Sequence, residues 1–314
     1  MAMRPRPARP LAAAILVLVA VSGASAGGAL PLSTVNPDSA YPEGPTVVDG
    51  VLYYAEMGND RVMRFDGTAN APVWTRDGCG PTAVVALGDG SLAVLCHREE
   101  IVARIGTNGA LVGLVDRDRD GRSFSNPNAG TIDGKGGVYF SSSGTFAPGA
   151  RATGAILHLD SSGTLTRVAE GIHYANGVAV SPDGGTLYAS EHLERRVLAF
   201  DIAADGTLSN RRTLVRLDDL VGADTNRSWE IGPDGLNVDR EGNLIIAEYG
   251  AGHLLVVDRA GTLVATITVP ERYVTASAFD GDETRLFITA PASLMDPSRG
   301  AVYATPYPVA RLGR

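Results

Sequence analysis

The stretch Val178-Ala-Val-Ser-Pro-Asp183-Gly184-Gly-Thr-Leu187-Tyr-Ala-Ser190, followed by Arg196-Val-Leu-Ala-Phe-Asp201, decides the fold of this 314-residue chain. It has the pattern of an apolar strand, an Asp- and Gly-rich turn, a second apolar strand, a short polar loop and a third strand. The same order recurs in Leu236–Glu248 with His253–Asp258, and in Val47–Glu56 with Arg61–Asp66. Weaker copies cover Gly80–Gly106, Gly130–Asp160 and Thr275–Ala304. The sequence therefore contains six related β-units.

The spacing of these units indicates the architecture. They recur about every 35 to 60 residues, which is typical of propeller blades and longer than most helical or leucine-rich repeats. Helical periodicity is almost absent after residue 26, whereas Gly-rich turns and β-branched runs are frequent. We therefore predict an all-β fold, a six-bladed β-propeller with a central metal site. A β-sandwich is the alternative, but it would not explain six similar units.

A closed ring of blades needs its first and last segments to share one blade. The strand-like segment Leu30–Val35 precedes the first unit, and the last unit ends at Ala304. We expect this segment to be the outer strand of the blade formed by Ala276–Ala304. Main-chain hydrogen bonds would then close the ring.

The N-terminal segment has the three parts of a secretory signal peptide. These are basic residues Arg4, Arg6 and Arg9, the apolar stretch Leu11–Val21 and the small-residue cleavage site Ala24-Ser25-Ala26. We therefore assign residues 1–26 to a signal peptide and residues 27–314 to a single propeller domain, which is exported and is periplasmic or secreted. An uncleaved N-terminal anchor is the alternative. The serine-hydrolase-like motif of residues 23–27 falls in this leader and predicts no chemistry.

The composition excludes some classes of partner. The formal net charge is −8, and the arginines are scattered rather than arranged in a stripe. We therefore expect no nucleic-acid partner. We expect the mature protein to be a monomer that acts on a small molecule and has no membrane partner.

Cys79 and Cys96 are the two cysteines. Residues 82–95 between them have the pattern of a hairpin, which brings its ends together. The predicted register does not place the two cysteines directly opposite each other, so a disulfide and two free thiols are both compatible with the sequence. No histidine stands in a cysteine-protease pattern, so we predict no thiol catalysis.

Four of the six units begin with an oxygen-bearing side chain, namely Glu43, Asn128, Asn176 and Asp234. At the start of an innermost strand, such a side chain would point towards the propeller axis, where ligands from several blades converge on one cation. Carboxylate and amide oxygens suit Ca²⁺, Mg²⁺ or Mn²⁺, and no Cys/His cluster suggests zinc. Because three or four protein ligands leave coordination positions open, there is room for water and substrate. A plain turn role is the alternative for each of the four.

Three motifs in this order resemble one known family: Glu43-Gly-Pro, Asn176-Gly-Val-Ala-Val-Ser-Pro-Asp-Gly-Gly-Thr-Leu-Tyr and Pro-Asp234-Gly-Leu-Asn-Val-Asp-Arg-Glu-Gly-Asn-Leu. It is the regucalcin/gluconolactonase/luciferin-regenerating-enzyme family of six-bladed propellers, and the likeness covers nearly all of the chain after the leader. The resemblance implies Glu43, Asn176 and Asp234 as ligands of a divalent metal, Ca²⁺ first, with Mg²⁺, Mn²⁺ or Zn²⁺ as alternatives. It implies that Asn128 faces the substrate or the metal. It also implies lactone hydrolysis, in which the metal polarises the ring carbonyl and Asp234 is the general base.

The third unit departs from that family. Its sugar lactonases carry Arg-x-Asn-Asp-Gly where this chain has Asn126-Pro127-Asn128-Ala129-Gly130. An arginine fork suits a polyhydroxylated substrate. Its absence puts an aldonolactone substrate in doubt.

The histidines have weaker patterns. His173 lies shortly before Asn176, so we predict it as the pocket histidine and a substrate-binding residue. His97, His192 and His253 follow second strands or open third strands, and we predict them as surface or loop residues.

Two further features have no obvious chemistry. Glu56, Glu191 and Glu248 share the end of a second strand, which predicts a structural role as caps of loop N–H groups. The segment Asp218–Gly232, which contains Trp229, is either a lid over the tunnel or a peripheral loop.

The predicted function is that of an exported, divalent-metal-dependent hydrolase, a lactonase that opens a small lactone. One alternative is an esterase or phosphotriesterase with the same metal. The other is a binding module in which the metal is only structural.

Overall fold

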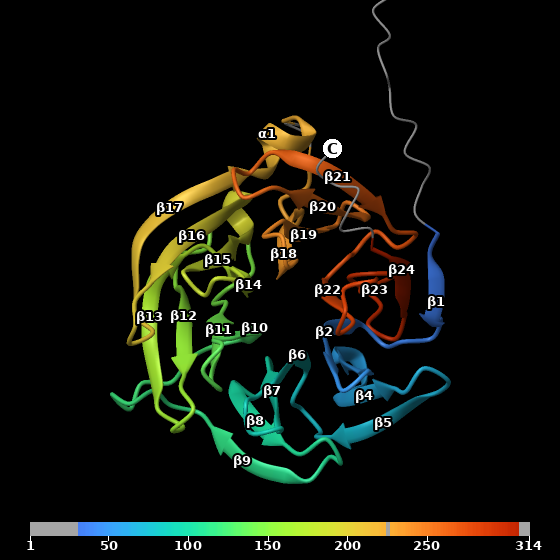
Figure 1. Ribbon diagram of the computed structural model, residues 1–314, viewed down its shortest axis with the longest axis horizontal. Coiled ribbons are helices and arrows are strands. Elements are labelled where there is room, and N and C mark those ends of the chain that lie inside the picture. The colour runs from blue at the N-terminus through green and yellow to red at the C-terminus, as the bar shows by residue number, and fades with distance from the viewer. Residues whose placement is uncertain (1–30, 224–226, 308–314) are drawn as a thin grey trace, which may run out of the picture.

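A computed structural model describes residues 31–223 and 227–307 of the chain. Figure 1 shows an all-β ring of sheets around a central hollow, with each sheet extending from the centre to the rim. This arrangement is a propeller, as the repeat predicts. The predicted signal peptide, residues 1–26, lies outside the described residues.

The strands form one sheet of eight strands and four sheets of four. The eight-stranded sheet contains β2 (Pro42–Val48), β3 (Val51–Glu56), β4 (Arg61–Phe65), β5 (Asn70–Thr75), β6 (Pro81–Ala86), β7 (Leu92–Cys96), β8 (Ile101–Ile105) and β9 (Leu111–Val115). The next two sheets contain β10 (Pro127–Ile132), β11 (Val138–Ser142), β12 (Gly154–Leu159) and β13 (Leu165–Ile172), then β14 (Ala175–Val180), β15 (Thr186–Glu191), β16 (Arg196–Ile202) and β17 (Leu208–Arg216). The last two contain β18 (Gly232–Val238), β19 (Leu244–Tyr249), β20 (His253–Val257) and β21 (Leu263–Thr268), then β22 (Ala276–Phe279), β23 (Arg285–Pro291) and β24 (Gly300–Pro306) with β1 (Ser33–Asn36).

Burial changes from the axis to the rim of each sheet. The second strands, such as β7 and β19, are buried throughout, whereas the outermost strand β9 is largely exposed and β21 is mostly partly buried or exposed. Apolar side chains pack between neighbouring sheets, and one such cluster joins Ile245 and Leu254 to Ile288 and Tyr303. Because the second strands are covered on both faces, they are continuous apolar runs in the sequence.

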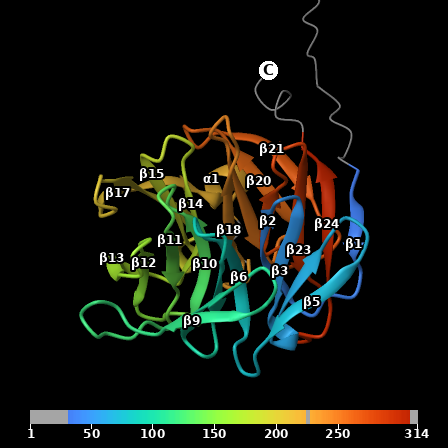
Figure 2. The ribbon, with the colours of Figure 1, turned by 60° about the horizontal axis from the view of Figure 1, so that its bottom comes forward.

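The two ends of the described chain share one sheet. β1 pairs antiparallel with β24, with Ser33 opposite Ala304 and Thr34 opposite Tyr303. Figures 1 and 2 both show these strands side by side. The predicted closure, in which the segment before the first unit forms the outer strand of the last blade, is confirmed.

The three second-strand glutamates are buried and paired. Each bonds a basic side chain at the start of the next strand: Arg61 with Glu56, Arg196 with Glu191 and His253 with Glu248, all at 2.6 Å. Glu191 also accepts the backbone N–H of His173. The predicted structural role is confirmed, but it is carried mainly by these side-chain pairs rather than by capping of loop N–H groups.

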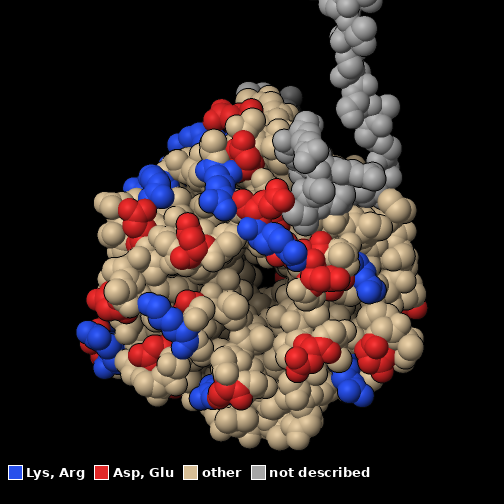
Figure 3. All heavy atoms as spheres, in the orientation of Figure 1, with Lys and Arg blue, Asp and Glu red and all other residues tan. Residues whose placement is uncertain are grey.

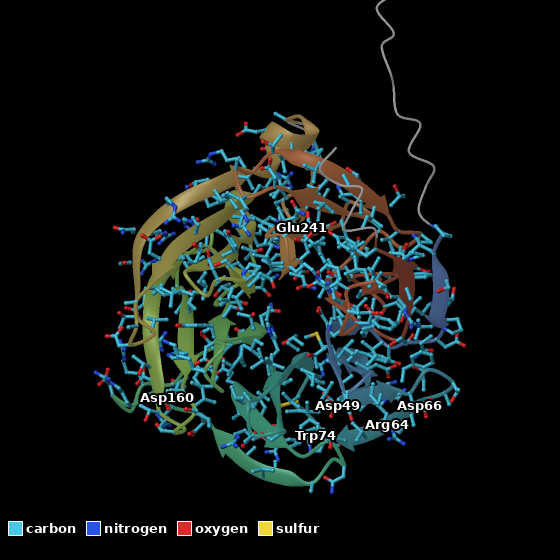
Figure 4. The ribbon with its side chains drawn as sticks, in the orientation of Figure 1. Asp49, Arg64, Asp66, Trp74, Asp160 and Glu241 are labelled. Atoms are coloured by element: carbon cyan, nitrogen blue, oxygen red, sulfur yellow. A yellow bond between two sulfur atoms is a disulfide. The ribbon has the colours of Figure 1, made fainter. Side chains whose placement is uncertain are left out.

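Aspartates hold the turns at the ends of hairpins. Asp160 accepts the backbone N–H groups of Ser162 and Thr164, and Asp66 accepts that of Thr68. Figure 4 labels Asp66 and Asp160 and shows both towards the outer part of the ring, away from the central hollow. These aspartates are turn residues.

Helix is scarce in the described residues. They contain one short α-helix, α1 (Leu217–Val221), and two 3-10 turns, η1 (Met57–Asn59) and η2 (His192–Glu194). Within residues 31–223 and 227–307, no helix combines the length and the apolar character needed to cross a bilayer.

Cys79 and Cys96 form a disulfide, with their Cα atoms 4.5 Å apart. In the ladder between β6 and β7, Cys96 lies opposite Pro81 rather than opposite Cys79. Cys79 therefore reaches its partner from the turn before β6. Of the two states compatible with the sequence, the structure has the disulfide.

Candidate active site

Four oxygen-bearing side chains from four different innermost strands meet in one cavity. The cavity has a volume of about 100 Å³, and its lining includes Glu43 of β2, Asn128 of β10, Asn176 of β14 and Asp234 of β18. All four residues are buried. The structure thus brings together every oxygen-bearing residue that the repeat singles out.

A wider chamber of about 400 Å³ is lined by the later residues of the same innermost strands, such as Val85, Ile132 and Val180. These residues are mostly small or apolar. Figure 3 shows the ring hollowed at its centre, with charged side chains of both signs scattered around the opening. Chemistry-bearing groups are therefore concentrated in the smaller cavity.

A break in strand pairing occurs at each of the four oxygen-bearing residues. The pairs of residues that flank these register shifts are Glu43 and Thr46, Pro127 and Gly130, Ala175 and Val178, and Pro233 and Leu236. Such irregularities redirect a side chain that regular alternation would send to a face of the sheet. These irregularities allow the four side chains to point into the shared cavity instead.

Glycine follows three of the four residues because neighbouring strands touch there. A Cβ atom at Gly177 would lie 2.1 Å from the carbonyl oxygen of Asp234, and one at Gly235 would lie 2.5 Å from that of Thr275. A larger residue at either position would push the innermost strands apart. The paired motif of an oxygen-bearing residue and glycine is thus the sequence signal of the converging strands.

Contacts between sheets hold the carbonyl group just before each of the four residues. The side chain of Thr275 contacts the carbonyl oxygen of Pro42, Thr82 that of Pro127, Ser143 that of Ala175, and His192 that of Pro233, at 2.6 to 3.1 Å. Each contact links one sheet to the next. The four backbones around the cavity are therefore held in a fixed relation.

Backbone strain marks the same places. Tyr41 and Tyr174 have φ values of 49° and 58°, and each lies two residues before an oxygen-bearing residue. The left-handed conformation costs a bulky residue on the order of 1 kcal/mol. Both tyrosines line the cavity, so the strain coincides with the candidate site. The shared spacing in Tyr41-Pro-Glu43 and Tyr174-Ala-Asn176 was the signal available in the sequence.

Glu43 and Asp234 are two buried carboxyl groups that line the same cavity. Burial raises the pKa of both well above the ordinary carboxyl range, and the nearby charge of Asp234 raises that of Glu43 further. No lysine or arginine is among the described residues that line the cavity. Beside them, Oδ1 of Asn176 is buried and has no hydrogen-bond partner in the described part of the chain. The cavity therefore has unmet negative charge and an unpartnered acceptor.

These three residues fit a divalent cation. Oxygen ligands from carboxylate and amide groups are those that Ca²⁺, Mg²⁺ and Mn²⁺ prefer, and Asn128 could add a fourth. Nowhere in the described chain do three or more His, Cys, Asp and Glu side chains form a group suited to a metal. The candidate set is not such a group, because only two of its ligands are carboxylates and the others are amide oxygens of asparagine.

His97 and His192 line the cavity, although the sequence pattern predicts surface or loop positions for them. Both lie in loops, as predicted, but neither faces away from the site. Each follows a second strand and turns inward, so that its Nδ1 lies 3.2 Å or 3.1 Å from the carbonyl oxygen of Pro127 or Pro233. Burial lowers the pKa of both rings to about 4. Both are therefore neutral near pH 7.

His173 does not reach this cavity, so its assignment as the pocket histidine is corrected. Its Nδ1 lies 3.0 Å from Glu194, and its ring lines a separate surface pocket with Arg227 and Trp229. The next residue, Tyr174, faces the cavity instead. His173 and Tyr174 form the turn between β13 and β14, and the left-handed conformation of Tyr174 places that residue, and not His173, on the cavity side.

Part of the segment before β18 packs on the cavity wall. Trp229 contacts Phe146, with ring centroids 4.8 Å apart, and Phe146 lines the cavity. The carbonyl oxygen of Glu230 lies 2.9 Å from Nε2 of His192. Residues 224–226 of the segment lie outside the described residues. The described part after this gap therefore belongs to the surroundings of the site.

Comparison with known proteins agrees with this architecture. Residues 41–292 match the family model described as SMP-30/Gluconolactonase/LRE-like region. The chain belongs to this family. The matched range contains all four oxygen-bearing residues of the cavity.

Curated relatives include enzymes and calcium-related proteins. The chain is 29% identical to pentonolactonase XacC of Haloferax volcanii, over 79% of this chain and 80% of that protein. It is 31% identical to L-arabinolactonase of Azospirillum brasilense, but that match covers 56% of this chain and only 58% of the relative. It is 26% identical to regucalcin of Xenopus laevis, over 81% and 86% of the two chains.

Solved structures share the fold. A gluconolactonase from Xanthomonas campestris superposes with a TM-score of 0.71 at 25% identity, covering 88% of this chain and 89% of that one. A regucalcin from Agrobacterium tumefaciens, described as a calcium-binding protein, superposes with a TM-score of 0.71 at 19% identity, covering 88% and 93%. At that identity the second likeness concerns the fold alone.

Proposed function

We propose that this protein is a divalent-metal-dependent lactonase whose active site is the cavity at the propeller axis. Membership of the family and the lactonase relatives support the hydrolase class. One observation carries the metal dependence. Two buried carboxyl groups, Glu43 and Asp234, lie beside the unpartnered Oδ1 of Asn176, and no lysine or arginine is among the described residues that line their cavity.

The proposed scaffold is a six-bladed propeller. Its eight-stranded sheet consists of two antiparallel quartets joined only by the parallel pair of Gly44 and Ala83. Gly44 and Ala83 both lie on innermost strands, where neighbouring sheets touch. We therefore count this sheet as two blades, which agrees with the six units of the sequence.

Glu43, Asn176 and Asp234 would hold the cation, with Ca²⁺ as the first candidate and Mg²⁺, Mn²⁺ or Zn²⁺ as alternatives. When bound, the cation supplies a Lewis acid that polarises the lactone carbonyl and offsets the two carboxylates. The donor set itself favours the harder cations over Zn²⁺.

Asp234 is the proposed general base. Its carboxylate takes a proton from water as the water oxygen attacks the carbonyl carbon, and this proton passes to the ring oxygen as the acyl C–O bond breaks. One water is consumed, and the product is a hydroxy acid. Asp234 is available for this role near pH 7 only if positive charge offsets its burial. Asn128, whose side chain lines the same cavity, would orient the substrate.

We also propose that residues 1–26 are removed and that the mature monomer is periplasmic or secreted. The disulfide between Cys79 and Cys96 supports an oxidising compartment.

A single set of measurements tests the enzyme proposal. The mature chain is purified, its bound metal is measured by elemental analysis, and a panel of lactones and esters is assayed before EDTA treatment, after it, and after re-addition of Ca²⁺, Mg²⁺ or Mn²⁺. We expect EDTA to abolish turnover and one of the cations to restore it. The Asp234→Asn variant should lower kcat/KM by about 10³-fold, the range of a lost general base. Full activity in the variant would overturn the role of Asp234. Metal that stabilises the fold without turnover of any substrate would favour a binding module.

A further inference from the structure

We infer that the substrate is an apolar lactone or ester, in which an alkyl or aryl group replaces the hydroxyl groups of a sugar lactone. This inference rests on the proposed lactonase function. It concerns the part of the cavity away from the carboxylates, which the hydrolytic mechanism does not use.

The wall of the cavity is aromatic and aliphatic. Phe146 contacts Tyr174 and His192, with ring centroids 4.7 Å and 5.3 Å apart, and it also contacts Trp229. Met57 and Leu294 complete the apolar lining. A wall of this kind gains free energy by removing carbon surface from water, which favours a hydrocarbon substituent.

Several polar atoms of the wall already have partners within the protein. The hydroxyl groups of Tyr41 and Tyr249 are 2.7 Å apart and bond each other. Nδ1 and Nε2 of His192 lie 3.1 Å and 2.9 Å from the backbone carbonyl oxygens of Pro233 and Glu230, and the neutral ring donates to one of them. The hydroxyl of Thr82 donates to the carbonyl of Pro127. A polyhydroxylated ring would lose its bonds to water here and find few replacements, so the wall rejects it.

Most of the unused polarity belongs to the residues that would bind the metal and the reacting group. These are Glu43, Asp234, Asn176 and Asn128, all from the starts of innermost strands. Asn126, where sugar lactonases of the family carry arginine, is turned away, and its side chain donates to the backbone carbonyl of His97 at 3.4 Å. Ala129 lies in the wider chamber. The site therefore has groups for one carbonyl and few for a row of hydroxyls.

Exposed apolar side chains continue this wall outward. Trp229, which packs on Phe146, is 44% exposed, and Met295, next to the cavity residue Leu294, is 87% exposed. A cavity of about 100 Å³ holds the reacting ring, and a longer substituent would extend over these two side chains. Exposed apolar groups at the edge of a pocket are typical of a ligand-binding surface.

Two substrate series test the inference. The first is a set of δ-lactones with alkyl chains of increasing length, together with an aryl lactone such as dihydrocoumarin. The second is glucono-δ-lactone and arabinono-γ-lactone. We expect kcat/KM to rise about fourfold for each methylene buried, and the sugar lactones to fall about 100-fold or more below the best alkyl lactone. Sugar lactones that equal or exceed the alkyl series would overturn the inference while leaving the lactonase proposal intact.

A matched pair of variants locates the effect. Phe146→Ser should reduce kcat/KM for the longest alkyl lactone about tenfold, mainly through KM, and leave Ca²⁺ affinity unchanged. Leu111→Ser removes an equally apolar side chain from the exposed outer strand β9 and should change neither value. Equal effects of the two variants on KM would contradict the assignment of the aromatic wall.

A binding measurement separates this inference from the lactonase proposal. An alkyl δ-lactam, which is not hydrolysed under assay conditions, is titrated against the calcium-loaded protein while tryptophan fluorescence is recorded. Saturable binding of the alkyl lactam, weakened by Phe146→Ser, supports the apolar site even if no lactone is turned over. Failure of both the alkyl lactam and the alkyl lactones, with turnover of sugar lactones, would refute the apolar site alone.

Discussion

Buried carboxylates occupy two repeat positions in this propeller, and their surroundings are opposite. At the ends of second strands, Glu56, Glu191 and Glu248 each bond a basic side chain. At the starts of innermost strands, Glu43 and Asp234 have no lysine or arginine beside them among the described residues of the cavity. Basic side chains of the protein offset the charge of the first set, whereas no lysine or arginine among the described residues of the cavity does so for the second.

The pKa values follow this difference. Burial acts to raise the pKa of Glu248, but hydrogen bonds from His253 and Arg195 outweigh it, so the pKa lies below the ordinary value. Burial raises the pKa of Glu43 and Asp234 with too little compensation. Both sets are buried, so the presence of a basic partner is what separates a structural carboxylate from a candidate ligand.

The largest expected effect comes from removing one axial carboxylate. Glu43→Gln should lower Ca²⁺ affinity by about 100-fold or more, since outer-shell changes alone cost 10- to 100-fold in metal sites, and turnover should fall with it. The metal-free variant should be at least as stable as the metal-free wild type, because a repelling charge is gone. Isothermal titration with Ca²⁺ and thermal unfolding in EDTA measure the two effects.

Glu56→Gln is the matched control for this experiment, since it makes the same change at a buried second-strand position. It should leave Ca²⁺ affinity within about twofold of the wild type, because its partner is Arg61 and not a metal. A loss of affinity in the control that equals the loss in Glu43→Gln would remove the distinction between the two positions.

The second effect is on stability alone. Glu248→Gln should lower the free energy of unfolding by about 2 kcal/mol, because it leaves Arg195 and His253 without their shared carboxylate. Loss of one partner from a fully buried pair costs about 3 to 5 kcal/mol, and the partial exposure of these two side chains reduces the penalty. Urea denaturation measures the change, and Ca²⁺ affinity should not move. An unchanged free energy of unfolding would show that the pair contributes nothing.

Much of the scaffold could be predicted because blade geometry imposes a repeated pattern. Second strands covered on both faces must be apolar, and glycine must follow an oxygen-bearing residue where innermost strands touch, as at Gly177 and Gly235. These constraints are local in the sequence. They therefore predicted the propeller, its closure by the N-terminal strand and the four residues that meet at the axis.

The wall of the cavity could not be predicted in the same way. Tyr174, which adopts a left-handed conformation, faces the cavity. The prediction had chosen the neighbouring His173 instead. Phe146 and Trp229 belong to loops, whose path no periodicity describes. The disulfide was undecided because Cys79 lies in a turn before β6, outside the hairpin register. Contacts between loops of different blades depend on the closed ring and have no local signal.

A smaller effect concerns pH. In the metal-free protein, the raised pKa values of Glu43 and Asp234 mean that the stability contributed by these groups is fully present below the unfolded carboxyl pKa of about 4. This stability is lost as the pH rises through the raised pKa values that the two groups have in the folded protein. Lowering the pH from 7 to 5 in EDTA should therefore stabilise the wild type relative to Glu43→Gln, by about 1 kcal/mol per pKa unit of difference.

The stability contributed by two histidines of the cavity has the opposite pH dependence. The prediction is therefore tested as the difference in stability between the wild type and Glu43→Gln. Burial lowers the pKa of His97 and His192 to about 4, so their contribution is lost as pH falls from about 6.5 towards 4. Both proteins carry these histidines, and their contribution cancels in the comparison. Thermal unfolding of the two proteins at several pH values, with saturating Ca²⁺ as the second condition, provides the check. A pH-independent difference in EDTA would argue against an uncompensated carboxyl pair.

The smallest effect extends the comparison to a carboxylate that has a partner but little burial. Asp201 accepts a hydrogen bond from Arg212 at 2.7 Å, and both side chains are largely exposed. Water competes for both groups and screens their attraction, so Asp201→Asn should leave the midpoint of urea unfolding unchanged. Glu248→Gln, measured in parallel, should show a clear shift. If the two variants are equally destabilised, burial does not determine the strength of these ion pairs. The difference between the second-strand glutamates and the carboxylates of the cavity would then depend on metal binding alone.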